Sequence, residues 1–139
     1  RTSIGDKKII IFGHSSTKKD ISFNELENYY DKSFYDNHKY ITIIGENKTY
    51  KYEIFSIYVE TSDFTYMNLN IDNETYNSYL NKYKEKSLYD TEVGVEESDE
   101  ILILQTCSNS SNYKNYDKKY LLVIANLVLQ VIQILNQQQ

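Results

Sequence analysis

Three residues that together could carry out acyl transfer stand at the ends of apolar runs that read as buried strands. They are His14 after Lys7–Phe12, Cys107 after Ile101–Thr106, and Lys119 before Tyr120–Ala125. If the last two strands pair antiparallel, as a short connection favours, the strand end at Cys107 faces the strand start at Lys119. His14 joins them if its strand neighbours these two. We therefore expect a thiol and an ammonium group, with an imidazole added in that case, at one edge of a sheet.

A thiol beside an imidazole and a cation suits nucleophilic catalysis. A free thiol has a pKa of about 8.5 and is mostly protonated at neutral pH. A nearby imidazole or cation favours the thiolate, which is the nucleophile. The same imidazole can protonate a leaving amine, and a fixed cation can stabilise the oxyanion of a tetrahedral intermediate. These residue types predict acyl transfer through a thioester.

The structural alternative is that none of these residues reacts. A single Cys after an apolar run can be a small buried hydrophobic residue, and His14 can be a hydrogen-bonded turn histidine. We interpret His38, in a helix-to-strand connection, in that way. With two His and one Cys at no close ligand spacing, we expect no zinc site and no other metal or cofactor.

The elements around these residues predict one mainly β domain with inserted helices. A capping box of Ser22 and Glu25 favours a helix at 22–35. Besides the three strands above, we expect a hairpin of Tyr40–Ile44 and Thr49–Val59 around Gly45–Lys48, an amphipathic helix at Asp72–Lys86, and a turn with a short extended piece at Ser87–Val95. The chain beyond Asn126 fits either a strand or a short helix, with a frayed end at Gln137–Gln139.

Composition excludes some partners. The 139 residues suit one small domain, and the formal net charge of -5, with basic residues clustered only in pairs such as Lys7-Lys8, excludes the basic patch that nucleic acid binding needs. The apolar stretch Tyr120–Leu135 is shorter than the roughly 20 residues that span a bilayer. We expect no membrane contact through the residues given and interpret the start at Arg1 as that of a fragment.

Two motifs, in order along the chain, resemble those of class B sortases, a family of cysteine transpeptidases. Ile101–Cys107 resembles a strand ending in Thr-Leu-x-Thr-Cys, with Ile103 in place of the first Thr. Ile9–His14 resembles a strand ending in Gly-His, followed here by Ser15 where class B members usually have Asn. The similarity covers about residues 3–125, through Phe23–Phe34, His38–Ile41, Lys48–Ser56 and Ser87–Thr91.

The resemblance implies the roles of these residues. Cys107 would attack the carbonyl of a Thr in a cell-wall sorting signal to form a thioester, with His14 as general acid and base. Gln105, Thr106, Leu104 and Ser15 would contact the substrate, and the helix at 72–86 with Thr61–Asn70 would wall its groove. An amine of the peptidoglycan cross-bridge or of a pilin lysine would then take the acyl group.

The chain departs from the family pattern where the strand after the Cys begins. The family has Arg there, whereas this chain has Lys119, or less favourably Lys118. Lys supplies charge without the planar fork of Arg, so we expect impaired activity. The alternative functions are a degenerate sortase-like domain that binds peptides or assembles with weak or no turnover, and an ordinary β-rich structural domain.

The resemblance also implies a fold and a location. We expect a sortase-type closed β-barrel whose N-terminal strands are missing from this chain. Residues 1–125 would form the catalytic domain and 126–139 a last strand or helix with a frayed tail. The protein would act on the extracellular face of the cell membrane of a Gram-positive bacterium, held by a membrane anchor absent from this chain.

Overall fold

The computed structural model describes residues 7–13, 24–69 and 71–132, whose strands form one five-stranded sheet in the order β1-β4-β5-β3-β2. The strands are β1 (Lys8–Phe12), β2 (Tyr40–Ile44), β3 (Lys48–Glu60), β4 (Ile101–Cys107) and β5 (Tyr120–Ile132). The α-helices are α1 (Lys32–Asp36) and α2 (Asn73–Lys86), and the 3-10 helices are η1 (Asn24–Tyr30), η2 (Thr65–Met67) and η3 (Ser111–Tyr113).

The direction of three neighbouring strands brings the strand ends next to the candidate residues to one end of the sheet. β1 pairs parallel with β4, with Phe12 opposite Gln105. β4 pairs antiparallel with β5, with Cys107 opposite Tyr120. The end of β1, the end of β4 and the start of β5 therefore meet at one edge, as the sequence predicted.

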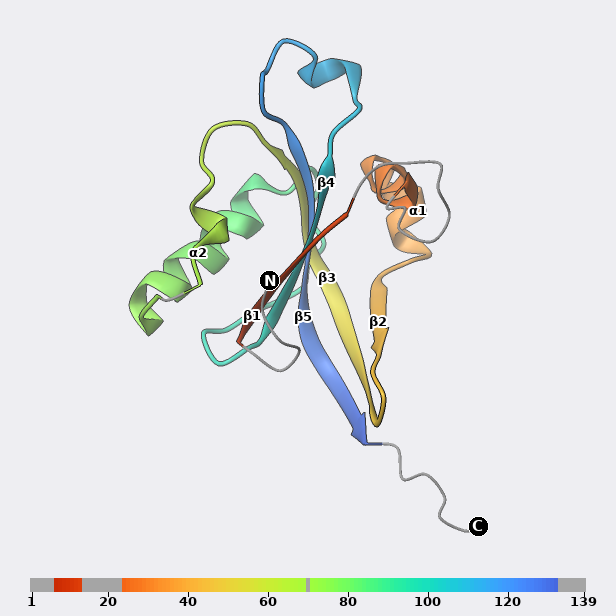
Figure 1. Cartoon of the computed structure of the whole chain (residues 1–139), viewed down its shortest axis with the longest axis vertical. Helices are drawn as coiled ribbons and strands as arrows, with labels where there is room; N and C mark the ends of the chain where they lie inside the picture. Colours follow the sequence, from red (N-terminus) through yellow and green to blue (C-terminus); the bar gives the residue numbers. More distant parts are fainter. Residues whose placement is uncertain (1–6, 14–23, 70, 133–139) are drawn as a thin grey trace.

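Helices cover both faces of the sheet, so the central strands are buried on both sides (Figure 1). One face packs against η1 and α1, the other against α2 and η2. Leu102 of β4 belongs to the first core and Ile103 to the second, because successive side chains of a strand point to opposite faces. This explains why Ile101–Leu104 of β4 and the first half of β5 are continuous apolar runs.

Most predicted elements are present, but the predicted helix at 22–35 is broken in two. The 3-10 helix η1 ends at Tyr30, and Asp31 then starts α1, where its side chain accepts a hydrogen bond from the Ser33 N–H at 3.0 Å. An N-cap residue has non-helical backbone angles, which explains the break. Ser22 of the proposed capping box lies outside the described residues.

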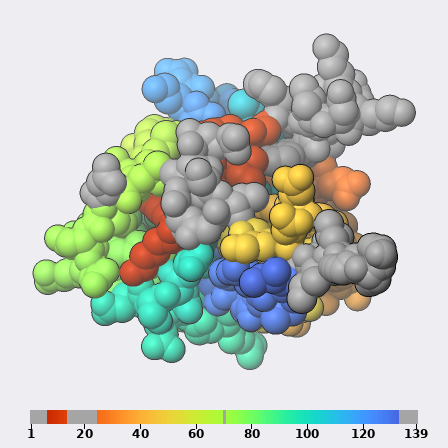
Figure 2. Space-filling model, turned by 60° about the horizontal axis from the view of Figure 1, so that its bottom comes forward, coloured from red at the N-terminus to blue at the C-terminus, as the bar shows by residue number. Residues whose placement is uncertain are grey.

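The sheet of the described residues is open, which corrects the expectation of a closed barrel. β1 and β2 are its edges, and no described strand bridges them. β5 continues past Ala125 to Ile132, so the first residues of the ambiguous tail are strand. Figure 2 shows this far end of β5 beside the β2–β3 hairpin, where Ile44, Leu129 and Ile132 are exposed. No helix among the described residues is long and apolar enough to cross a membrane.

Candidate functional site

Cys107 ends β4 with its side chain exposed, directly after six buried residues. This contradicts the alternative that the single Cys is an inert core residue. The thiol is accessible because β4 stops there, while the backbone before it is fixed between β1 and β5. A rigid strand thus presents the one thiol of the chain to solvent.

β1 ends beside the same point. The N–H of Gly13 donates to the carbonyl oxygen of Gln105 at 2.9 Å, which extends the parallel pairing one residue beyond β1. In the continued register Gly13 is therefore held opposite Thr106, one residue before Cys107. His14 and Ser15 lie outside the described residues.

The three predicted substrate-binding residues before Cys107 are all buried. Leu104 packs in the core on the η1 face. Thr106 has a buried hydroxyl with no hydrogen-bond partner among the described residues. Gln105 lies on the α2 face, where its Oε1 accepts a hydrogen bond from the Tyr66 hydroxyl at 2.5 Å. Burial raises the pKa of Tyr66, so this phenol stays protonated and donates.

Lys119 does not face Cys107, in contrast to our expectation. The N–H of Ser108 donates to the carbonyl oxygen of Lys119 at 2.9 Å. Lys119 therefore lies opposite Ser108, the residue after Cys107. The Lys119 ammonium donates to the carbonyl oxygen of Tyr116 at 3.2 Å. The residue opposite Cys107 is Tyr120.

A cavity of about 410 Å³ lies beside the β4–β5 loop, on the η1 side of the sheet. The Tyr30 hydroxyl is 2.5 Å from the Ser108 Oγ, and the Asn109 N–H donates to Glu27 at 3.2 Å. The cavity is lined by Glu27, Tyr30, Leu88, Tyr89, Ser110, Asn112 and Tyr113. The contacts of Ser108 and Asn109 fix the loop that follows Cys107. The sequence patterns had predicted neither contact.

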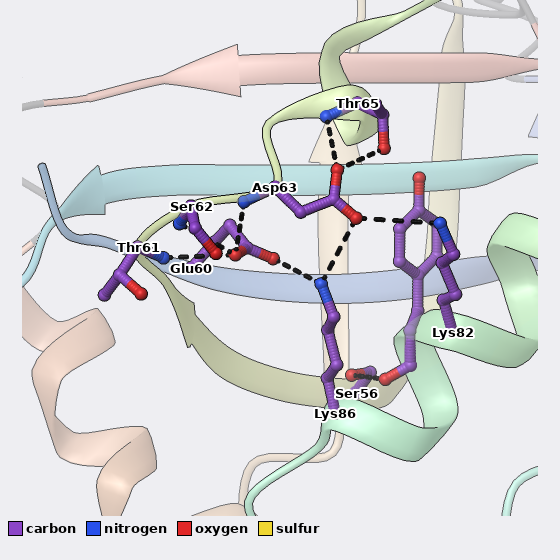
Figure 3. A network of polar contacts seen from close by, with 9 residues as sticks. Ser56, Glu60, Thr61, Ser62, Asp63, Thr65, Lys82 and Lys86 are labelled. Atoms are coloured by element: carbon purple, nitrogen blue, oxygen red, sulfur yellow. Dashed lines mark hydrogen bonds and ion pairs between the residues drawn. The ribbon is translucent and has the colours of Figure 1, made fainter.

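Figure 3 shows the polar network that fastens the segment 61–69, which follows β3, to α2. One oxygen of the buried Glu60 carboxylate accepts the N–H groups of Thr61, Ser62 and Asp63 at 2.9–3.1 Å, and the other accepts Lys86 at 2.6 Å. Burial opposes ionisation of Glu60, but the Lys86 and backbone donors outweigh it, so its pKa is lowered. The ionised Glu60 carboxylate thus binds the start of this segment through its backbone N–H groups and links it to Lys86 of α2.

Lys8 fastens the same segment to β1. Its ammonium is buried, donates to the carbonyl oxygen of Asn68 at 2.9 Å and lies 5.2 Å from the ring centroid of Tyr79 on α2. Burial lowers the pKa of Lys8 to about 8. Segment 61–69 is therefore attached at both ends, near Glu60 and near Asn68.

Glu60→Ala is expected to lower the free energy of unfolding at pH 7 by about 2–3 kcal/mol, because three backbone N–H groups lose their acceptor. Glu60→Gln keeps an acceptor oxygen and should lose about 1 kcal/mol or less, since Lys86 is partly exposed. Urea unfolding measures both. Equal losses in the two variants would mean that charge, and not backbone capping, stabilises the segment.

The same network gives a pH dependence. The pKa of Asp63 is lowered to about 2, chiefly by hydrogen bonds from Thr65. Because both carboxylates have lowered pKa values in the folded state, their contribution is present above the unfolded pKa values near 4 and is lost as the pH falls toward 2. Acidification from pH 5 to 2 should therefore destabilise the wild-type protein more than Glu60→Gln.

The described residues contain no group of three His, Cys, Asp or Glu side chains that could hold a metal ion. What the arrangement offers is an exposed thiol at a strand end that is fixed between two neighbouring strands. Such a thiol is suited to nucleophilic catalysis.

Comparisons with known proteins agree on one family. A family model described as the sortase domain matches residues 2–128. The chain is 34% identical to sortase B of Listeria monocytogenes over 124 residues, which are 88% of this chain and 49% of the relative. It is 30% identical to sortase B of Staphylococcus aureus over 120 residues, 86% of this chain and 48% of the relative.

Solved structures show the same architecture. The structure described as a Staphylococcus aureus sortase B-substrate complex superposes with a TM-score of 0.74 at 27% identity, over 88% of this chain and 57% of that one. This chain spans about half the length of the curated relatives it matches.

Proposed function

This chain belongs to the sortase family, with class B sortases among its relatives, and from that premise we propose that it is a cysteine transpeptidase acting through Cys107. The substrate would be a sorting-signal peptide of a surface protein, cleaved after Thr. The observation that carries the proposal is the exposed thiol at the end of β4, beside the end of β1. The proposal of a bound substrate is supported by a relative whose structure is described as a Staphylococcus aureus sortase B-substrate complex.

The proposed reaction has two acyl transfers. The Cys107 thiolate attacks the Thr carbonyl, the peptide C–N bond breaks, and His14 protonates the leaving amine. An acceptor amine then attacks the thioester, loses a proton to His14 and leaves Cys107 free. Gly13 is hydrogen-bonded to Gln105 near Cys107, and His14 is the next residue in the chain after Gly13. This supports the proposed role of His14.

The other predicted site residues would act around this pair. We propose that Gln105 and Thr106 shape the backbone beneath the acyl group, and that Leu104 holds β4 in the core. Ser15 would contact the peptide, and Lys119 would add positive charge to this end of the sheet. The acceptor would be a peptidoglycan cross-bridge or pilin amine, on the extracellular face of a Gram-positive cell membrane.

A degenerate domain that binds peptide with weak or no turnover is the second candidate function. It is favoured by one observation: the Lys119 ammonium is held by the Tyr116 carbonyl, and no described cation is paired with Cys107 across the strands. On this reading the groove would retain its peptide without completing the transfer.

A ligation assay tests the proposal. The protein is incubated with an Asn-Pro-Gln-Thr-type peptide and triglycine, and the products are analysed by mass spectrometry. We expect a thioester adduct of the protein and a peptide joined to triglycine. The adduct without ligated product supports the degenerate domain, while the absence of both excludes turnover by this chain.

A further inference from the structure

The structure identifies a residue that the motifs did not mark. We propose that the Tyr120 hydroxyl is a catalytic hydrogen-bond donor to the oxygen of the acyl group carried by Cys107. The inference rests on the proposed function and names the group that would stabilise the oxyanion.

The pairing of β4 with β5 places the two side chains together. Ser108 and Lys119 form a hydrogen-bonded pair, so the preceding pair, Cys107 and Tyr120, is a non-hydrogen-bonded one. In such pairs the Cα atoms are about 4.5 Å apart and the side chains are closest. The residues of a pair share one face of the sheet, so Tyr120 is the cross-strand neighbour of the thiol.

Contacts on the α2 face fix the Tyr120 ring. Its centroid is 5.8 Å from that of Phe64 at 75°, an edge-on contact of the kind that aromatic rings prefer. Phe64 belongs to the segment that Glu60 and Lys8 fasten. Tyr120 is half-buried, so the ring is held while its far end reaches the surface. A held donor needs little reorganisation when charge develops beside it.

No described residue engages the Tyr120 hydroxyl, which leaves it free to meet a ligand as far as the described part of the chain is concerned. Two other tyrosine hydroxyls of the site region already have hydrogen-bond partners. Tyr66 donates to Gln105, and Tyr30 is hydrogen-bonded to Ser108. Within residues 7–13, 24–69 and 71–132, the hydroxyl of Tyr120 has no hydrogen-bond partner. A phenol hydroxyl can donate a hydrogen bond through its O–H group.

In the proposed reaction, negative charge develops close to Cys107, the residue opposite Tyr120. Attack by Cys107 turns the Thr carbonyl oxygen into an oxyanion attached, through carbon, to the sulfur. Two other donors at this end of the sheet are engaged, the Lys119 ammonium with Tyr116 and the Tyr66 hydroxyl with Gln105. The Lys118 ammonium lies 5.9 Å from the centroid of the Phe64 ring. A phenol thus stands opposite Cys107, at the register position where a cation was expected.

Tyr120→Phe tests the proposal because it removes the hydroxyl and retains the ring that packs on Phe64. We expect kcat/KM for thioester formation to fall by about 10²-fold, as for loss of one oxyanion donor. The matched control is Tyr116→Phe, the same change at an exposed tyrosine of the β4–β5 loop, which should leave the rate unchanged. Equal rates in wild-type protein and Tyr120→Phe would overturn the proposal.

A second measurement does not depend on turnover. A peptide aldehyde ending in threoninal forms a hemithioacetal with Cys107, whose oxygen occupies the place of the oxyanion. Its affinity, measured by protection of Cys107 from iodoacetamide, should fall at least about tenfold in Tyr120→Phe. Direct alkylation by iodoacetamide forms no oxyanion and should be unchanged. Unchanged aldehyde affinity would again overturn the proposal.

A donor-rescue pair excludes a purely structural explanation. Tyr120→Gln supplies an N–H donor without the ring, whereas Tyr120→Leu supplies neither. The Gln variant should retain the higher kcat/KM and the tighter aldehyde affinity, and the reverse order would contradict a donor role. If wild-type protein forms no thioester and binds no aldehyde, the proposed function fails together with this inference. If it does both and Tyr120→Phe matches it, this inference alone fails.

Discussion

Cys107→Ala is expected to lower formation of the ligated peptide by at least about 10³-fold, because the thioester cannot form without the nucleophile. The chain has no second thiol to take over. The side chain is exposed at a strand end, so its truncation removes no core contact. The urea midpoint of the variant should therefore match that of the wild-type protein. Ligation is measured by the mass-resolved assay above.

Two further observations would test this assignment. Native protein should incorporate one iodoacetamide group at the exposed thiol, and the labelled protein should lose ligation to the same extent as Cys107→Ala. Product that survives in Cys107→Ala would contradict the mechanism. A thiol that reacts only after unfolding would contradict the exposure seen in the structure.

The sequence predicted the site at the level of strand ends but not at the level of side-chain pairs. Apolar runs before His14 and Cys107 located two strands, and their order favoured a common edge. The pairing register decides which residue lies opposite Cys107, and a shift of one position moves a side chain to the other face. The sequence shows where Tyr120–Ala125 is apolar but carries no signal for that register, so Lys119 was expected where Tyr120 lies.

The hydroxyl contacts were beyond sequence analysis for a different reason. The chain has 15 Tyr, and nothing local distinguishes Tyr66, which bonds Gln105, from the other phenols. Tyr30 and Ser108 are 78 residues apart, so only the folded chain brings their hydroxyls together. The polar residues Asn126 and Gln130 likewise obscured the second half of β5, whose side chains are largely exposed.

The two faces of β4 have different roles, one in anchoring the strand and the other in presenting the candidate catalytic groups. On the η1 face, Leu104 is buried and Ser108 is tied to Tyr30, so this side secures the strand and its loop. On the α2 face, Gln105 precedes Cys107 along β4, and Tyr120 lies opposite Cys107 on β5. The chemistry is therefore expected on the α2 face, and its precision depends on a strand that cannot move.

Leu102→Ala tests that dependence and should lower the free energy of unfolding by about 2–5 kcal/mol. Leu102 is fully buried in the strand that carries Cys107, between Ile9 of β1 and Ala125 of β5. Truncation leaves a cavity that the paired strands cannot readily collapse into. Urea unfolding measures the loss.

The matched control is Leu129→Ala, the same substitution at a half-exposed position of β5, where about 0.5 kcal/mol or less is expected. At temperatures where both variants remain folded, kcat should fall in Leu102→Ala and not in Leu129→Ala, since the cavity loosens the strand that positions the thiol. Equal unfolding free energies in the two variants would show that β4 is not the rigid support assigned to it. If Leu102→Ala lost stability without any change in kcat, the positioning of Cys107 would not depend on the packing of Leu102, which would contradict the prediction.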